Sequence, residues 1–307
     1  MKELLRRLFL DPEPPLVAVE VRPRAIGVLR LVARGGSRAF GSAASLAVPE
    51  AALRLSMTES NLADAPAFRQ TLRSVLERAG VLGGARVALV LPDPVGRIAI
   101  LPAAEVKGRG PAETEELIRF RLKKAVPFEV KDARIGFRRD AAGQVIAVAA
   151  LRAVLDPYEA ECRAVGLEPG LVELSGLALL EAVEASRPAP DRLLVNWDEG
   201  YVSIFLVREG ALVLARTLSG ASESEPAQVL REVENTLVYY RERLGGGALG
   251  AAVLRSAAFP PLDALRLLQS SVAGPVEILD PQAPGVSAPA LAQELAGAAA
   301  SLLGRVA

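Results

Sequence analysis

Histidine is absent from this 307-residue sequence, and cysteine and lysine are scarce. The lack of histidine excludes Ser-His-Asp and Cys-His nucleophilic sites as well as histidine metal ligands. Cys162 is the only cysteine, so an intramolecular disulfide and a four-cysteine zinc site are also excluded. No lysine follows Lys131, which excludes a lysine-dependent phosphate site in the second half of the chain. The composition leaves enzymes that rely on carboxylates, and proteins that act by binding.

Charge and hydropathy favour a soluble, cytoplasmic protein that does not bind nucleic acid. The 36 basic residues balance the 36 acidic ones, and only 4% of the residues are aromatic. No apolar run approaches the roughly 20 residues that span a bilayer, and we expect no secretory signal. The N-terminal segment 1–15 contains an amphipathic stretch, Met1–Leu10, followed by prolines. This stretch could dock on its own domain, or it could contact a membrane surface.

One order of elements, three strands, a helix and a fourth strand, is predicted twice. The first set comprises strands at Leu16–Val21, Ile26–Val32 and Ser37–Val48, a helix at Ala65–Arg78 and a strand at Val87–Leu91. The second set comprises strands at Leu193–Trp197, Val202–Val207 and Ala211–Thr217, a helix at Val229–Leu244 and a strand at Ala251–Leu254. Such an internal repeat predicts two related α/β halves.

We therefore predict an α/β protein with two lobes around a cleft. The first lobe spans 16–187, contains an inserted small α/β subdomain at about 95–151, and ends at the linker Arg187–Pro190. The second lobe spans 188–307. Its last helix, Ala290–Leu303, is nearly all alanine and leucine, and we expect it to be buried near the lobe interface. Any ligand of such a fold would bind at the hinge.

Four segments together carry a family resemblance. They are the helix and Pro-Phe pair of Glu116–Phe128, the strand, helix and turn of Val145–Pro169, the hairpin Leu193–Gly210 with the following Arg216–Gly220, and the long helix Glu232–Arg241. Their order and spacing resemble PilM, the actin-like cytoplasmic protein family of type IV pilus assembly, and more distantly the cytoplasmic part of GspL from type II secretion. The resemblance covers most of Leu16–Leu303. It implies the duplicated ribonuclease-H-like fold of actin, in agreement with the internal repeat.

The positions that would hold a nucleotide in this family depart from its pattern. Glu20 stands where the resemblance expects the magnesium-binding aspartate, and Arg22 and Pro23 stand where glycine and serine are expected. Arg22 and Arg24 could still attract phosphate. In the second hairpin, Asn196, Asp198 and Gly200 belong to a turn in which Trp197 adds bulk and Asp198 and Glu199 add negative charge. We expect a pseudo-ATPase without a cofactor, for which ATP and magnesium are only a weak alternative.

Two further departures from the family pattern concern the adenine side of the cleft. Leu254–Phe259 replaces the expected glycine triplet, and only Ala221–Gln228 connects the third strand to the long helix, where the family has a small subdomain. The second-lobe subdomain is therefore expected to be missing.

A nuclease is an alternative function for the same hairpins. Glu20, Asp198 and Glu199 could form a carboxylate cluster for two metal ions. Arg22 would then lie among the carboxylates, and the chain lacks a basic nucleic-acid surface, so we place this reading well below the others.

The resemblance implies a scaffold that binds the N-terminal cytoplasmic peptide of a PilN-like inner-membrane protein. A PilO-like protein and a second copy of this chain are further expected partners, and membrane contact is expected through the partner. The peptide groove is expected near Val87–Leu101 and Leu117–Phe128, with Leu117, Phe120, Pro127 and Phe128 as pocket formers or as ordinary core residues. Basic residues at the end of the helix in Glu116–Phe128 have two possible roles. They complement the helix dipole, or they face anionic lipid or an acidic partner. The alternatives are an active actin-like ATPase and an adaptor outside pilus biology.

Overall fold

The computed structural model describes residues 15–34, 37–81, 83–140, 142–186, 191–221, 226–280 and 293–303. The expected amphipathic stretch Met1–Leu10, the linker Arg187–Pro190 and positions 290–292 of the expected last helix lie outside these residues. Among the described residues, no helix is both long and apolar enough to cross a membrane.

The first lobe is built on a five-stranded sheet with the order β3-β2-β1-β4-β8. Its strands are β1 (Val17–Arg22), β2 (Ala25–Arg34), β3 (Ser37–Ala47), β4 (Arg86–Leu91) and β8 (Glu168–Leu174). The first three strands pair antiparallel, whereas β4 pairs parallel with β1 and β8 parallel with β4. Every residue of β1 is buried, as a central strand covered on both faces requires. Helices α2 (Ala65–Arg78) and α5 (Arg152–Ala164) contribute to the core on one face.

The second lobe repeats this plan with the strand order β11-β10-β9-β12-β13. Its strands are β9 (Asp191–Asp198), β10 (Gly200–Arg208), β11 (Ala211–Ala221), β12 (Ala251–Ser256) and β13 (Val276–Ile278). Their directions match those of the first sheet, so the predicted internal duplication is confirmed. Helices α7 (Pro226–Arg243) and α8 (Pro261–Gln269) share one core with this sheet. Four residues separate β11 from α7, which leaves no room for another folded unit between them.

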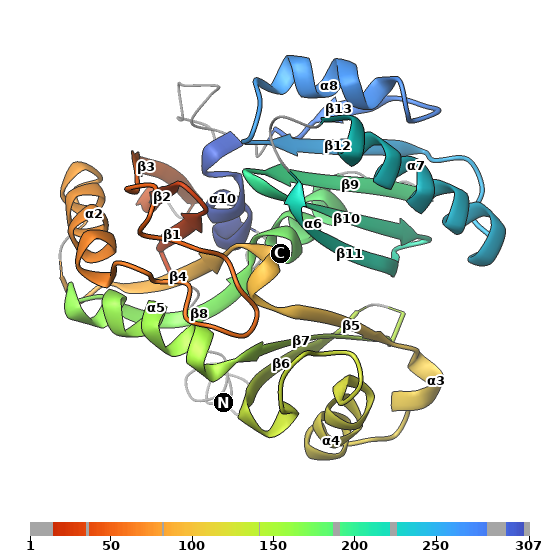
Figure 1. Cartoon of the computed structure of the whole chain (residues 1–307), viewed down its shortest axis with the longest axis horizontal. Coiled ribbons are helices and arrows are strands. Elements are labelled where there is room, and N and C mark those ends of the chain that lie inside the picture. Colours follow the sequence, from red (N-terminus) through yellow and green to blue (C-terminus); the bar gives the residue numbers. More distant parts are fainter. Residues whose placement is uncertain are drawn as a thin grey trace.

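Two helices fill the space between the sheets (Figure 1). Helix α6 (Ser175–Ser186) buries leucines against Leu194 and Phe205 of the second sheet. Helix α10 (Ala296–Leu303) packs its alanines against Ala18, Leu29 and Ala88 of the first sheet. The last described helix therefore lies at the lobe interface and returns to the first lobe. Small side chains allow this close packing, because alanine and glycine let a helix approach a sheet.

The inserted subdomain lies between β4 and α5 and carries a three-stranded antiparallel sheet, β5-β7-β6. Its elements are β5 (Arg97–Leu101), α3 (Ala103–Val106), α4 (Pro111–Leu122), β6 (Ala133–Arg139) and β7 (Val145–Leu151), with 3-10 turns at Asp93–Val95 and Val130–Asp132. Helix α4 packs on one face of this sheet through Ile118 and Leu122. Helix α4 ends at Leu122, just before a turn that contains Pro127.

Strand β8 has seven residues and includes Pro169 and Gly170, two residue types that argue against a strand in sequence. Proline has no backbone N–H to donate. Because β8 is the edge strand of its sheet, a missing N–H on its open side breaks no hydrogen bond with another strand of that sheet.

Candidate functional site

The two hairpins that face each other across the hinge are joined by an ion pair. Arg22, at the end of β1, directs its guanidinium toward the carboxylate of Asp198 at the end of β9, with 3.1 Å between Nη2 and Oδ1. The same guanidinium donates to the carbonyl oxygen of Ala257 at 3.1 Å. Both charged side chains are almost completely buried. This ion pair therefore joins the first and second lobes at the predicted cleft.

Arg255, in β12, is the centre of this cluster and has no solvent-exposed surface. Its guanidinium donates to Asp198 Oδ2, to Asn196 Oδ1 at 3.0 Å and to Glu20 Oε1 at 3.4 Å. Its Nε donates to the carbonyl oxygen of Gln293 at 2.9 Å. One buried side chain therefore connects β1, β9 and the segment that leads into α10.

Glu20 is held by helix α10 as well as by Arg255. The backbone N–H of Ala298 donates to Glu20 Oε2 at 2.7 Å. A Cβ at Gly297 would approach Glu20 Oε1 to 2.6 Å and Ser175 Oγ to 2.8 Å, so the helix can lie this close only with glycine there. Burial raises the pKa of Glu20 from 4.5 to about 7, although Arg255 and the Ala298 N–H act in the opposite direction.

A second buried carboxylate, Asp93, extends the cluster. It follows β4, and its Oδ1 accepts from the backbone N–H of Gly176 at 2.7 Å while its Oδ2 accepts from Asn196 Nδ2 at 2.9 Å. Burial raises the pKa of Asp93 above its ordinary value. Asn196 thus bridges Asp93 and Arg255, so the polar contacts form one network across the interface.

Asp198 titrates in the opposite direction from Glu20. Burial alone would raise its pKa, but Arg22 and Arg255 outweigh burial and hold the pKa of Asp198 well below its ordinary value. With Glu20 ionised, two guanidinium groups balance two carboxylates within this four-residue group. We call Glu20, Arg22, Asp198 and Arg255 the interlobe cluster.

Four of the six predicted nucleotide-site residues meet in this network, and two do not. All four are buried: Arg255 contacts Glu20, Asn196 and Asp198, and Arg22 joins them through Asp198. Arg24 lies in an exposed turn, and Gly200 is the exposed first residue of β10, with a φ of 76°.

Sequence reasoning missed Asp93 and Arg255 as members of the network. In each case the signal is a charged residue at the end of an apolar strand: Asp93 follows Val87–Leu91, and Arg255 follows Ala251–Leu254.

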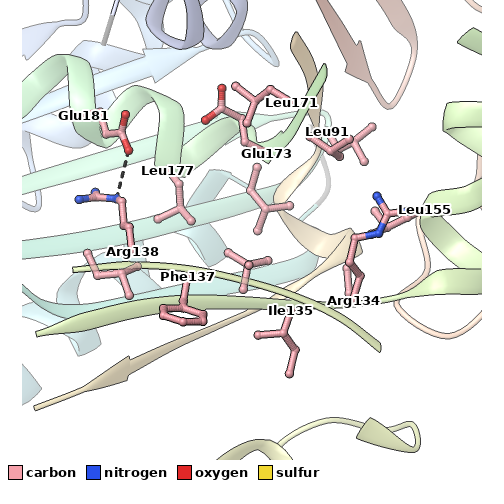
Figure 2. Close-up of a pocket in the computed structure, with 16 residues that line it drawn as sticks. Leu91, Arg134, Ile135, Phe137, Arg138, Leu155, Leu171, Glu173, Leu177 and Glu181 are labelled. Carbon is pink, nitrogen blue, oxygen red and sulfur yellow. Dashed lines mark ion pairs between the residues drawn. The ribbon is translucent and has the colours of Figure 1, made fainter. Parts of the chain in front are cut away.

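An apolar groove of about 340 Å³ lies on the other side of the first lobe, between β6 and β8. Ile146, Val148 and Ala150 of β7 line it and form the part that we call its floor, and Leu174 lines it at the end of β8. Leu177 of α6 also points into it (Figure 2). Both flanking strands are sheet edges. Among the described strands, β6 pairs only with β7 and β8 pairs only with β4. Edge strands present backbone N–H and C=O groups that can pair with another chain.

The register of β6 determines which of its side chains face the groove. Arg134, Gly136 and Arg138 lie opposite Ala150, Val148 and Ile146, respectively. These partners form the groove floor, so all three β6 positions face the groove. The alternate residues Ile135 and Phe137 pack into the opposite core, beneath α4. Gly136 has no heavy atom within 4 Å of an added Cβ, so the groove is open at this position.

Ion pairs close both ends of the groove. Arg138 Nε lies 3.1 Å from Glu181 Oε1 of α6, as the dashed line in Figure 2 marks. At the other end, Arg134 pairs with Glu159 and with Asp156 at 3.1 Å, both in α5. Each pair joins the inserted subdomain to a helix of the first lobe. The groove is therefore apolar along its length and charged at its ends.

None of the four predicted pocket formers lines this groove. Leu117 and Phe128 are half-buried in the core between α4 and the inserted sheet, on the face opposite the groove. Phe120 is 74% exposed, and Pro127 is also exposed. The structure thus has a groove between the first lobe and the inserted subdomain, but with other residues. The helical spacing of these apolar residues could not distinguish a groove wall from the underside of α4.

Comparisons with known proteins identify the fold. No protein-family model matches the sequence, and no curated protein matches it significantly. A chain of a PilM–PilN type IV pilus biogenesis complex superposes with a TM-score of 0.75 at 19% identity, covering 95% of this chain and 98% of that chain. A Bacteroides thetaiotaomicron protein with an actin-like ATPase fold gives 0.55 at 10% identity, over 86% and 90% of the chains.

A third similar structure is the cytoplasmic domain of EpsL, an inner-membrane component of the Vibrio cholerae type II secretion system. It gives a TM-score of 0.50 at 12% identity, over 78% of this chain and 81% of that domain. The predicted fold class, an actin-like fold of two α/β lobes, is confirmed. The predicted likeness to PilM is confirmed as a likeness of fold, and so is the more distant one to a type II secretion component.

Proposed function

We propose that this chain is a non-catalytic scaffold in a type IV pilus or type II secretion-like assembly platform. In this proposal it binds the N-terminal cytoplasmic peptide of a PilN-like inner-membrane protein. The observation that carries the proposal is the groove between β6 and β8, with its apolar floor and two strand edges that pair with no further strand among the described residues. The fold likeness to the PilM–PilN complex supports the choice of partner.

The groove suits an extended peptide for a chemical reason. A strand laid along β6 gains main-chain hydrogen bonds from the open edge, and every second side chain points to the floor. Ile146, Val148 and Ala150 would receive small or branched apolar side chains. The ion pairs of Arg134 and Arg138 would meet polar residues at the two ends of the bound segment.

The interlobe cluster supports the proposal that the chain does not hydrolyse ATP. A magnesium nucleotide needs carboxylates free to hold hydrated metal and backbone N–H groups open to phosphate. Here the Asp198 carboxylate is engaged by Arg22 and Arg255, and Glu20 by Arg255 and the Ala298 N–H. Freeing these carboxylates would break buried ion pairs. These residues do not fit a nucleotide, so we assign no cofactor and no catalytic step.

The proposed location is the cytoplasmic face of the inner membrane, reached through the membrane-anchored partner. A PilO-like protein and a second copy of this chain are additional partners in this proposal, and nucleic acid is not. An active actin-like ATPase is the competing function, and an adaptor outside pilus biology is another. No observation at the interlobe cluster favours the ATPase.

Co-purification from the native cell tests the scaffold with a matched pair of variants. Gly136→Leu places a side chain in the groove at a position where an added Cβ meets no heavy atom within 4 Å. Gly110→Leu is the control, because Gly110 is exposed, has a φ of −71°, has open space around it and lies outside the groove.

Wild type and Gly110→Leu should recover a PilN-like single-span protein from gently solubilised membranes, and Gly136→Leu should lose it. Recovery of no inner-membrane partner, or equal recovery by Gly136→Leu, contradicts the proposal.

A further inference from the structure

The C-terminal end of α4 combines positive charge with an exposed aromatic ring. The segment 117–128 contains four basic residues, Arg119, Arg121, Lys123 and Lys124, and no acidic residue. The inserted subdomain at 95–151 has eleven basic and seven acidic residues, a net charge of +4 in a chain whose total charge is zero. Residues 16–94 carry the same excess, with ten basic and six acidic residues, so the subdomain is one of two basic parts of the chain.

Two of these four cations are neutralised locally and two are not. Arg119 pairs with Glu115, and Arg121 pairs with Glu105. Lys123 and Lys124 are exposed and have no ion-pair partner within the described parts of the chain. They follow Phe120 by three and four residues, which places all three side chains on one side of the helix end. We call Phe120, Lys123 and Lys124 the α4 tip.

The helix dipole explains the two lysines but not the phenylalanine. Cations at a helix C-terminus interact favourably with the terminal carbonyl groups. The same argument gives no reason for a phenylalanine that is 74% exposed while its helix neighbours Ile118 and Leu122 are buried. Burying this ring in an apolar phase would be favourable. The two lysines would be attracted to a negatively charged surface, so they determine the charge of the surface on which the ring could be buried.

We propose that the α4 tip docks on an anionic phospholipid surface, with Phe120 entering the interface and Lys123 and Lys124 contacting lipid headgroups. Flexible, exposed lysines suit a diffuse anionic surface, whereas an acidic protein partner would favour a shaped groove. The apolar groove opens on the other face of the inserted sheet, so lipid and peptide contacts do not compete. One such patch gives weak, reversible binding that gains strength from a second tether.

Vesicle co-sedimentation of the full chain at low ionic strength and millimolar lipid tests this inference. We expect partition onto phosphatidylcholine vesicles that contain phosphatidylglycerol, little partition onto pure phosphatidylcholine, and loss of binding as salt rises. Lys123→Gln with Lys124→Gln should lower the partition coefficient about 30-fold, from the roughly 1 kcal/mol that each surface lysine contributes. Phe120→Ser should lower it about tenfold.

Matched controls exist on the second lobe. Arg241 and Arg243 are exposed in the last turn of α7, so Arg241→Gln with Arg243→Gln removes the same charge from the same kind of helix end. Leu262, which is 61% exposed, provides Leu262→Ser as the control for Phe120→Ser. The controls should bind as wild type does, and thermal unfolding should verify that every variant is folded.

Three outcomes overturn the inference. They are no preference for anionic vesicles, unchanged binding by the α4-tip variants, and equal losses in the second-lobe controls. Polyglutamate serves as a second probe. If it binds through Lys123 and Lys124 while vesicles do not, the surface recognises acidic polypeptide and the lipid assignment is wrong.

Discussion

Replacing Arg255 by methionine tests whether the interlobe cluster holds the two lobes together. The substitution preserves much of the side-chain volume but removes the cation that contacts Asp198, Asn196 and Glu20. At pH 8 it leaves two buried carboxylates facing one remaining guanidinium, that of Arg22. Breaking a buried ion pair by removing one partner costs about 3–5 kcal/mol. That is a large part of the roughly 5–15 kcal/mol that stabilises a typical domain.

Chemical denaturation followed by fluorescence and circular dichroism measures this loss. The chain has one tryptophan, Trp197, which is buried next to Asp198 and stacks edge-on with Phe259 at 5.0 Å, so its emission reports on this part of the structure. Arg266→Met is the matched control. Arg266 is 75% exposed and pairs with Asp263 on the surface, and its loss should cost at most about 0.5 kcal/mol.

A double-mutant cycle with Glu20→Gln separates the ion pair from simple packing. Because Arg255 lies 3.4 Å from Glu20, the two substitutions should couple by about 1–3 kcal/mol, with Glu20→Gln partly restoring the stability lost in Arg255→Met. The reasoning is refuted if Arg255→Met costs less than about 1 kcal/mol, as a surface pair would, and the cycle gives no coupling.

Three further predictions concern the same interface. Glu20 has a folded pKa of about 7 against an ordinary value of 4.5, so its contribution to stability is fully present below pH 4.5 and is lost as pH rises to 7. Relative to Glu20→Gln, the wild type should therefore lose about 3 kcal/mol across that range and nothing above it; a flat difference contradicts the assignment. Gly297→Ala should destabilise by about 1–3 kcal/mol in denaturant titrations despite the better helix propensity of alanine, because its Cβ would overlap Glu20 Oε1. Isothermal titration with MgATP should give no binding in the micromolar range, and micromolar binding would overturn the pseudo-ATPase proposal.

The predicted fold followed from signals that are local in sequence. Apolar runs bounded by glycine and proline marked most strands of both sheets, and helix α2 matches its predicted bounds, Ala65–Arg78. Edge strand β8 carries no such signal, because it contains Pro169 and Gly170, which are tolerated only where one side of a strand is open. The predicted last helix is described only as α10 (Ala296–Leu303).

The site was harder to predict because its contacts join residues far apart in the chain. The hairpin positions Glu20, Arg22 and Asp198 could be aligned from the repeat, but nothing local indicates that Arg255 contacts both carboxylates. The groove depends on which edge of β6 remains unpaired and on strand register, which places Gly136 opposite Val148. The pocket formers expected on α4 lie on the other face of the same sheet. A periodic apolar pattern identifies a buried face without identifying what covers it.

Fluorescence anisotropy with a labelled PilN-like N-terminal peptide tests peptide capture most directly. Saturable binding is predicted for the wild type, for Gly110→Leu and for Phe120→Ala, whose side chain lies away from the groove. Gly136→Leu should remain folded and lose binding, because its new side chain occupies the space above Val148. If Gly136→Leu binds the peptide as tightly as the wild type, or if the wild type does not bind it, the groove between β6 and β8 is not the capture site.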